Sequence, residues 1–235
     1  MATMSDGTIS ASTATLHVEA RLAGIYGRPL WRSHAPPLDE LIATILSQHT
    51  SDLNSGRAFE ALRTQFPTWP DVVSANETDI AAAIQPGGLA RIKASRIKRV
   101  LCVVDTESGA LTLDWIRDWP LEEARAWLTA LPGVGPKTAA CVLLFSLGLP
   151  AMPVDTHVHR VGRRLGLIPA DVSAEEAHTI FDHLLGPDRD AIYSLHLNLI
   201  RHGRTTCKAR NPECDRCVLS DLCPSAFRAG GRSTG

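Results

Sequence analysis

The sequence predicts an all-α protein, and two observations support this prediction. Apolar residues recur at the three- and four-residue spacing of amphipathic helices along most of the 235 residues. No convincing run alternates apolar with polar residues, as a half-buried strand would. The apolar fraction of 44 % suffices for a substantial core. The length allows one large domain or two small ones.

Helical spacing and turn residues divide the first half of the chain. Residues 1–15 are rich in Ser, Thr and Ala, and we expect a disordered tail there. Helices are predicted at 16–26, 38–46 and 54–66, with a proline-containing connector over 27–37. Short helices follow at 71–75 and 79–84. A glycine turn at 85–89 precedes a helix over 90–103, and 106–119 is expected to be loop and short helix.

The second half continues the same alternation. A helix over 121–131 ends at Pro132, and an apolar stretch from Lys137 to residue 147 predicts a buried helix. Further helices are predicted at 156–165, 174–184 and 188–202.

The turn after Pro132 carries the first functional signal. Gly133 and Gly135 flank Val134, and a missing Cβ allows positive φ and close approach of the backbone to a ligand. A helix–hairpin–helix turn of this kind presents backbone N–H groups that can bind a nucleic-acid phosphate without reading sequence. A loop that merely joins two packed helices is the structural alternative.

A lysine and an aspartate near this turn could do chemistry together. On the hairpin alone, Lys137 is as consistent with a simple phosphate contact as with catalysis. If it is catalytic, burial and the helix N-terminus should favour its neutral amine. Asp155 stands where the N-cap of the next helix is expected, a role that is compatible with catalysis.

The net charge of −1 argues on average against a nucleic-acid-binding protein, but the charges are unevenly distributed. Residues 87–100 contain five basic residues and no acidic one, and acidic residues gather over 105–123. This pattern suits a protein with one basic face, although ordinary solvated helix faces would explain any single run. The basic residues are Arg91, Lys93, Arg96, Lys98 and Arg99, then Arg160, Arg163 and Arg164, then Arg201, Arg204, Lys208 and Arg210.

Four cysteines form a C-x6-C-x2-C-x5-C pattern: Cys207, Cys214, Cys217 and Cys223. Thiolates suit zinc or an iron–sulfur cluster. Structural zinc usually shows two close pairs, so one close pair between longer arms favours a [4Fe–4S] cluster. Two disulfides are a weaker alternative, because we expect a cytoplasmic protein.

Two further expectations concern the remaining cysteines and the location. Cys102 and Cys141 lie in apolar helical segments and are predicted to be buried thiols. No apolar run is long enough to span a membrane and no signal peptide is evident, so we expect a protein of the bacterial cytosol or nucleoid with no membrane partner. We also expect the protein to be a monomer.

In combination, these motifs resemble the endonuclease III family of DNA repair glycosylases. The resemblance rests on Leu-Pro-Gly-Val-Gly-Pro-Lys-Thr-Ala at 131–139, Val-Asp-Thr-His-Val-His-Arg at 154–160 and the cysteine tail, and it extends from about residue 16 to 227. It implies a helix-hairpin-helix DNA glycosylase fold of two helical domains with a DNA-binding cleft between them. A six-helix domain would cover 33–150. The other domain would join 16–32 to 151–235 and carry the [4Fe–4S] cluster.

The resemblance also implies an activity and a site. The family removes oxidised or ring-saturated pyrimidines from double-stranded DNA and nicks the resulting abasic site by β-elimination, as a bifunctional glycosylase and lyase. Lys137 matches the catalytic lysine and Asp155 the catalytic aspartate, while the four cysteines match the cluster ligands. Leu89 matches a side chain that wedges into the duplex. His49 stands where the family usually has a gap-filling glutamine, which leaves the opposite-base preference open.

Three alternatives remain at this point. An adenine glycosylase acting on mispairs shares the hairpin and the cysteines, and Gln48 beside His49 points weakly to it, but it usually has serine at the position of Lys137. A thymine-mismatch glycosylase typically has tyrosine there. A non-catalytic hairpin module that only senses DNA structure needs neither Asp155 nor the cysteines.

Overall fold

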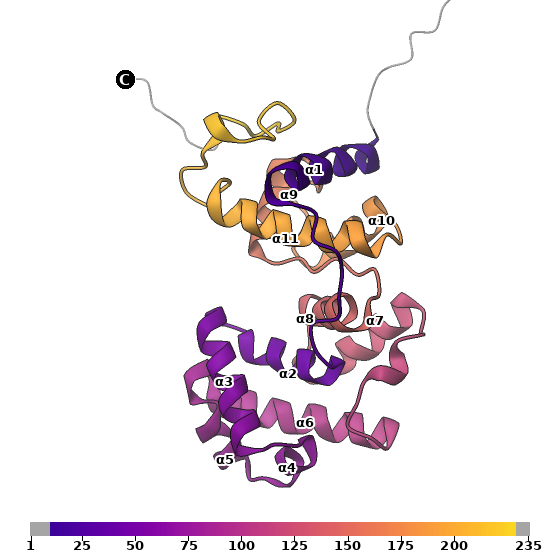
Figure 1. Cartoon of the computed structure of the whole chain (residues 1–235), viewed down its shortest axis with the longest axis vertical. Coiled ribbons are helices and arrows are strands. Elements are labelled where there is room, and N and C mark those ends of the chain that lie inside the picture. The colour runs from indigo at the N-terminus through magenta and orange to yellow at the C-terminus, as the bar shows by residue number, and fades with distance from the viewer. Residues whose placement is uncertain (1–9, 229–235) are drawn as a thin grey trace, which may run out of the picture. The chain divides into compact units, whose positions relative to one another are not determined.

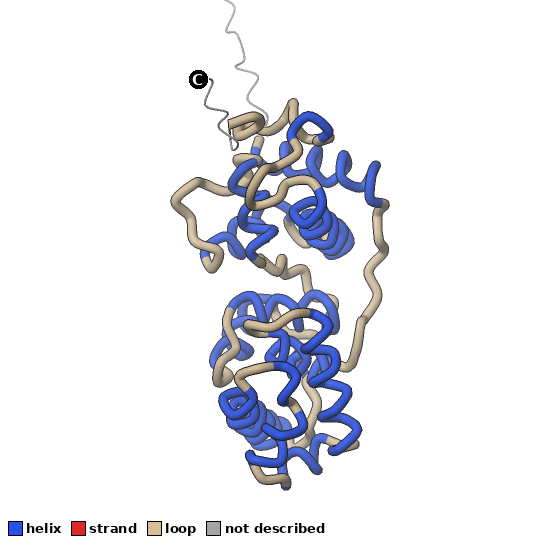
Figure 2. Tube along the Cα trace, turned by 90° about the vertical axis from the view of Figure 1, so that its left-hand side faces the viewer, coloured by secondary structure: helices blue, strands red, loops and turns tan. Residues whose placement is uncertain are grey.

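Every regular element in residues 10–228, the part of the chain that the computed structural model describes, is a helix (Figures 1 and 2). The prediction of an all-α protein is therefore confirmed. The chain divides into two compact units, one comprising Met1–Trp31 with Val154–Gly235 and the other Arg32–Pro153. The second unit begins one residue before and ends three residues after the predicted boundaries, at 32 against 33 and 153 against 150. Among the described residues, no helix is both long and apolar enough to cross a membrane.

The 32–153 unit holds the hairpin. Its elements in chain order are α2 (Pro37–Ser47), α3 (Asp52–Gln65), α4 (Trp69–Ser74), α5 (Glu77–Ala83), η1 (Gln85–Gly87), α6 (Ala90–Ser108), η2 (Asp114–Ile116), α7 (Leu121–Ala130), α8 (Pro136–Val142) and the π-helical turn η3 (Leu143–Leu147). Leu41, Ile45, Ile97, Leu101 and Leu128 of this unit are fully buried in one core to which α2, α6 and α7 contribute.

The resemblance implies six helices for this unit, and the structure has seven separate α-helices there, α2 to α8. The short helix predicted at 71–75 is α4, and it begins at Thr68, whose side chain accepts from the backbone N–H of Asp71 while the Asp71 carboxylate accepts from the backbone N–H of Thr68. This capping box starts α4 as a helix of its own, only six residues long.

Several helices differ from their predicted bounds, and two of these differences bear on the site. Helix α6 continues to Ser108, five residues beyond the predicted end at 103, and stops at Gly109, whose φ of +64° gives a left-handed C-cap. The stretch predicted as one helix from Lys137 to 147 is α-helical only to Val142 and then widens into η3. Cys102 on α6 is exposed, which corrects the prediction of a buried thiol, whereas Cys141 is buried as predicted.

The other unit contains α1 (Ala11–Tyr26), α9 (Thr156–Arg164), α10 (Glu176–Leu185), α11 (Arg189–Thr205) and the short η4 (Cys214–Arg216). Helix α1 packs against α10 and α11, and α9 packs against α11. The predicted disordered tail over 1–15 is wrong in its last residues, because Ser10 caps α1 by accepting from the backbone N–H of Thr13, and Thr15 is already fully buried. Residues 1–9 lie outside the described range.

Candidate active site and iron–sulfur tail

The hairpin lies between α7 and α8, in the order that the sequence predicts. Gly133 adopts φ +74°, a conformation that favours glycine, and Val134 closes the turn by donating its N–H to Leu131 O at 3.1 Å. Val134 is only 5 % exposed and fixes the turn to the core. The expectation of a positive φ is not met at Gly135, whose φ of −93° is ordinary extended backbone at the N-cap of α8. Apart from its two neighbours in the sequence, a Cβ at Gly135 would have no atom of this chain within 4 Å, so the glycine leaves open space in front of the backbone there.

Two side chains from other elements support the hairpin. A Cβ built on Gly133 would lie 1.9 Å from Nε of Arg96, so the Arg96 side chain occupies that space. Arg96 donates from Nη1 to Oε1 of Gln48 at 2.5 Å. Gln48 in turn donates from Nε2 to the carbonyl of Gly133 and to Oγ1 of Thr138, each at 3.2 Å. The chain from α6 through Gln48 thus holds both the hairpin and the first turn of α8.

Lys137 is the second residue of α8 and is half-buried. Its immediate neighbour Thr138 is 4 % exposed and bonded to Gln48, so the first turn of α8 has a fixed orientation. Helix α2 packs against α8 and brings Glu40 within electrostatic reach of Lys137. Burial raises the pKa of the Glu40 carboxyl, while a hydrogen bond from Thr44 and the charge of Lys137 lower it in part.

His49 and Leu89, the predicted duplex-facing residues, share an uncommon backbone conformation. His49 has φ +55° in the turn between α2 and α3, and Leu89 has φ +49° between η1 and α6. Both are exposed, and Leu89 exposes 53 % of its surface. Non-glycine residues at positive φ are uncommon and gather at functional sites.

Asp155 belongs to the other unit, where it is the N-cap of α9 as predicted. Its Oδ1 accepts from the backbone N–H groups of His157 at 2.8 Å and Val158 at 2.7 Å. The carboxylate is half-buried and held in one orientation, and these two bonds occupy only one of its oxygens.

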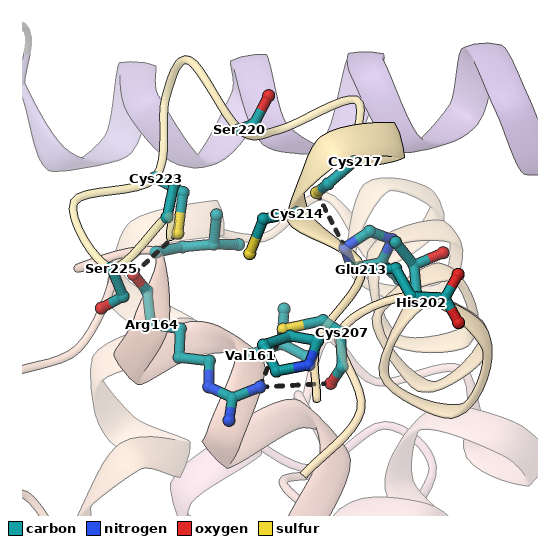
Figure 3. A pocket seen from close by; sticks show the side chains of 14 residues that line it. Val161, Arg164, His202, Cys207, Glu213, Cys214, Cys217, Ser220, Cys223 and Ser225 are labelled. Carbon is teal, nitrogen blue, oxygen red and sulfur yellow. Dashed lines mark hydrogen bonds between the residues drawn. The ribbon is translucent and has the colours of Figure 1, made fainter. Parts of the chain in front are cut away.

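The four tail cysteines line one hollow of this unit, and Figure 3 shows their side chains around it. Two N–H groups and one histidine ring nitrogen approach the sulfur atoms. Arg164 Nη1 lies 3.3 Å from Sγ of Cys207, and the backbone N–H of Leu219 and Nε2 of His202 lie 3.4 and 3.5 Å from Sγ of Cys217. N–H groups directed at sulfur are typical of iron–sulfur sites, where they stabilise the thiolate charge.

The chemistry of this donor set fits an iron–sulfur cluster. Burial raises the pKa of the Cys217 and Cys223 thiols, and the charges of the neighbouring cysteines raise them further. Bound iron ions would offset the cost of burying the negative thiolates, because cysteine binds metal in its deprotonated form. All four tail cysteines line the same hollow, so one bound group could reach all of them.

Several of the basic residues that the sequence suggested for a DNA-facing surface instead bind other groups of this protein. Arg160 donates to the carbonyls of Gly203 and Cys207, and Arg164 donates to that of Lys208 at 2.7 Å. Lys208 itself pairs with Glu213 in the cysteine loop. These residues therefore shape the loop, and sequence reasoning missed this role because charge alone does not distinguish a carbonyl partner from a phosphate.

Comparisons with known proteins agree with this arrangement. The model of the family described as "HhH-GPD superfamily base excision DNA repair protein" matches residues 42–187. The model of the family described as "iron-sulfur binding domain of endonuclease III" matches residues 207–223. The second match spans all four tail cysteines, and the chain carries a [4Fe–4S] cluster motif.

Two curated relatives illustrate the similarity. The chain is 38 % identical over 190 residues to a putative DNA glycosylase of Arabidopsis thaliana, covering 80 % of this chain and 64 % of that protein, so the match spans less than two thirds of the relative. It is 34 % identical over 194 residues to endonuclease III of Thermotoga maritima, covering 83 % and 85 % of the two chains.

Solved structures extend the likeness to the whole fold. A non-covalent endonuclease III–DNA complex superposes with a TM-score of 0.78 at 29 % identity, covering 94 % of this chain and 98 % of that one. A trapped endonuclease III–DNA covalent intermediate gives 0.76 at 28 % identity, with 94 % and 99 % covered. Together with the hairpin and the cysteine tail, these matches show that the chain belongs to the endonuclease III family of base excision DNA repair glycosylases.

Proposed function

We propose that this protein removes oxidised or ring-saturated pyrimidines from duplex DNA and then cuts the strand at the abasic site. The observation that carries the proposal is the position of Lys137, the second residue of α8, directly behind the glycine hairpin. A phosphate bound at the hairpin would bring the DNA backbone next to an amine that can act as a nucleophile. The similarity to a protein solved as a covalent intermediate with DNA supports this reading.

Binding would use shape and phosphates rather than sequence. The open space before Gly135 allows close approach of a phosphate to the hairpin backbone. The damaged nucleotide must leave the base stack before its sugar can be attacked. We propose that Leu89 inserts where the nucleotide leaves and that His49 faces the same gap, because both side chains are exposed on turns with constrained backbones.

Lys137 would act as the nucleophile. Its neutral amine attacks C1′ of the sugar, the bond from C1′ to the base breaks, and the base departs with the electron pair. Opening of the sugar ring at O4′ then gives an imine between Nζ of Lys137 and C1′. The imine acidifies the protons at C2′, so loss of one of them expels the 3′ phosphate and breaks the strand.

Asp155 would stabilise the cationic sugar as the base leaves and help to move protons. Its carboxylate is already oriented by two backbone N–H groups, so little reorganisation is needed during the reaction. Asp155 and Lys137 belong to different units of the fold, and the mechanism requires both to reach one sugar.

We propose that Cys207, Cys214, Cys217 and Cys223 bind the [4Fe–4S] cluster. When bound, the cluster supplies a rigid cross-link between separate positions of the tail. Arg164 would hold this loop against α9, since it bonds both to Cys207 and to the carbonyl of Lys208. Thiols that must stay reduced for cluster binding support a cytosolic location.

The alternatives are weaker on specific grounds. The weak pointer to an adenine glycosylase is the tripeptide Gln48-His49-Thr50, yet the amide of its first residue is bonded to Arg96, Gly133 and Thr138 within the protein. A non-catalytic module needs neither Asp155, beyond its role as the cap of α9, nor the four cysteines of the tail.

A panel of duplexes tests the proposal, each containing one defined base. We expect base release and a nick on the 3′ side from duplexes with an oxidised or ring-saturated pyrimidine. Undamaged duplexes and duplexes with A·G or G·T mispairs are the controls. Release from mispairs alone would contradict the proposal in favour of a mismatch glycosylase, and binding without any release would favour the non-catalytic module.

A further inference from the structure

A buried lysine joins the two turns that carry His49 and Leu89. Lys93 lies on α6 and exposes only 1 % of its surface. Its Nζ donates to the carbonyl of Leu46 at 2.7 Å and to the carbonyl of Gly87 at 2.8 Å. A lysine is almost never this deeply buried unless it is paired, so these two hydrogen bonds compensate for the loss of water around its amine.

The two carbonyls lie just before the two duplex-facing residues. Leu46 is in the last turn of α2, where helix carbonyls have no helical N–H partner, and it precedes His49 by three residues. Gly87 ends η1 and precedes Leu89 by two residues. His49 and Leu89 are two of the four non-glycine residues at positive φ in the described part of the chain. One ammonium group therefore anchors both the turn that holds His49 and the turn that holds Leu89.

The turns are also packed closely on either side of this anchor. A Cβ on Gly87 would lie 3.0 Å from Cβ of Ala58 on α3 and 3.8 Å from the carbonyl of Leu46. The end of η1 thus rests against α3 and the end of α2, which leaves little freedom for one turn to shift without the other. Burial lowers the pKa of Lys93, and the charge of Arg96 lowers it further. Because Lys93 is almost completely buried and its Nζ donates to two backbone carbonyls, a direct phosphate contact is not its role.

We propose that Lys93 is a positioning residue that fixes the spacing of the His49 and Leu89 turns, so that both side chains enter the duplex together when the damaged nucleotide leaves. This inference rests on the proposed function. It assigns to the most buried cation of the basic helix a role in nucleotide extrusion. Processing of a ready-made abasic site would depend on it much less, because such a site is less stacked and unpaired at the start.

Lys98 offers a matched control on the same helix. Its Nζ donates to the carbonyl of Ala75 at 2.7 Å, so it also holds a backbone carbonyl from a half-buried position. Ala75 is the C-cap of α4 and belongs to neither of the two turns. Lys98→Met therefore removes the same kind of bond and the same charge without touching the turns of His49 and Leu89.

The test measures single-turnover rates of full-length, cluster-loaded protein on two duplexes, one with a damaged pyrimidine and one with an abasic site. We expect Lys93→Met to slow excision from the lesion duplex about tenfold or more while abasic-site cutting changes less than about threefold. Lys98→Met should leave the ratio of the two rates unchanged. Fluorescence of 2-aminopurine beside the lesion, which rises when a neighbouring base unstacks, should show slower extrusion only for Lys93→Met.

A double-mutant cycle shows whether Lys93 acts through Leu89. If it does, adding Leu89→Ala to Lys93→Met should cost excision little more than either change alone. Gly87→Ala, which presses on the same turn through Ala58, should give the same selective loss and serves if Lys93→Met does not fold.

The outcomes separate this inference from the function on which it rests. Equal loss on both duplexes, or fully additive effects of Lys93→Met and Leu89→Ala, would overturn the role of Lys93 and leave the glycosylase function intact. Wild-type protein that releases no base and cuts no abasic site would overturn the proposed function, and the inference with it.

Discussion

The side chain of Arg96 fills the space that any side chain at Gly133 would need, with Nε only 1.9 Å from the position of the missing Cβ. This contact joins the basic helix α6 to the hairpin between α7 and α8. Because Arg96 is in turn bonded to Gln48, the hairpin is held from two sides.

Gly133→Ala should therefore destabilise the protein by about 1–3 kcal/mol, since a left-handed backbone and a steric conflict combine. Urea unfolding measures the effect. Removing the obstructing side chain should relieve the steric part, so Gly133→Ala combined with Arg96→Ala should cost less than the sum of the two single changes. Strict additivity would show that Arg96 does not restrict this position.

Glu40 should make stability depend on pH in a definite direction. Burial raises the pKa of its carboxyl above the ordinary 4.5, so its contribution to stability is full below that value and is lost as pH rises through the folded-state pKa. Glu40→Gln should therefore be at least as stable as wild type at neutral pH and gain nothing at about pH 4. Urea midpoints at both values check this, with the exposed Glu60→Gln on α3 as control. A neutral-pH loss specific to Glu40→Gln would contradict it.

Glu40→Gln should also change the pH dependence of excision. A negative charge near the Lys137 ammonium group favours its charged form, so removing the Glu40 charge should move the acid limb of the excision pH profile to lower pH. An unchanged limb would mean that Glu40 does not influence Lys137, the proposed nucleophile.

The basic helix should contribute to DNA binding through its exposed charges only. Arg91 is exposed two residues after Leu89, whereas Lys98 is occupied by the carbonyl of Ala75. Log affinity falls as log salt rises. Arg91→Ala should make this fall shallower, reducing the magnitude of the slope by about 1, and Lys98→Met should leave the slope unchanged. Titrations of one duplex at several salt concentrations measure both. A lower slope for Lys98→Met alone would contradict the assignment.

The tail should hold iron. Anaerobically purified protein should be yellow-brown and contain about four iron atoms per chain, as a [4Fe–4S] protein does. Cys214→Ala should lose most of this iron, whereas Cys102→Ser, at an exposed cysteine outside the tail, should retain it. One zinc per chain and no iron would refute the cluster.

Sequence patterns predicted the hairpin and the helices because both depend on residues close together in the sequence, such as turn glycines, helix caps and regularly spaced apolar residues. Glycine at positive φ was expected at Gly133, and an aspartate before an amphipathic segment was expected to cap α9, as Asp155 does. The start of α1 was missed because the capping role of Ser10 was not distinguished from a polar tail.

Long-range contacts were not predictable in the same way. A lysine in a basic run reads as a solvated charge, and nothing near Lys93 in the sequence indicates that residues 46 and 87 supply its two carbonyl partners. The left-handed backbones of His49 and Leu89 were also hidden, because leucine rarely adopts positive φ and histidine, although more tolerant of it, does so far less often than glycine.

The most direct test of the account asks whether Lys137 becomes covalently attached to DNA. Borohydride reduces an imine to a stable amine, so enzyme, lesion duplex and borohydride together should give a protein–DNA adduct that survives denaturation. Lys137→Ala and Lys137→Gln should form no adduct and lose both base release and strand cutting, with DNA binding largely retained. Asp155→Asn should keep the helix cap, slow excision about 100-fold or more, and still give some adduct at a ready-made abasic site. An adduct at wild-type yield with Lys137→Ala would contradict the account, and so would base release by the wild type without any adduct.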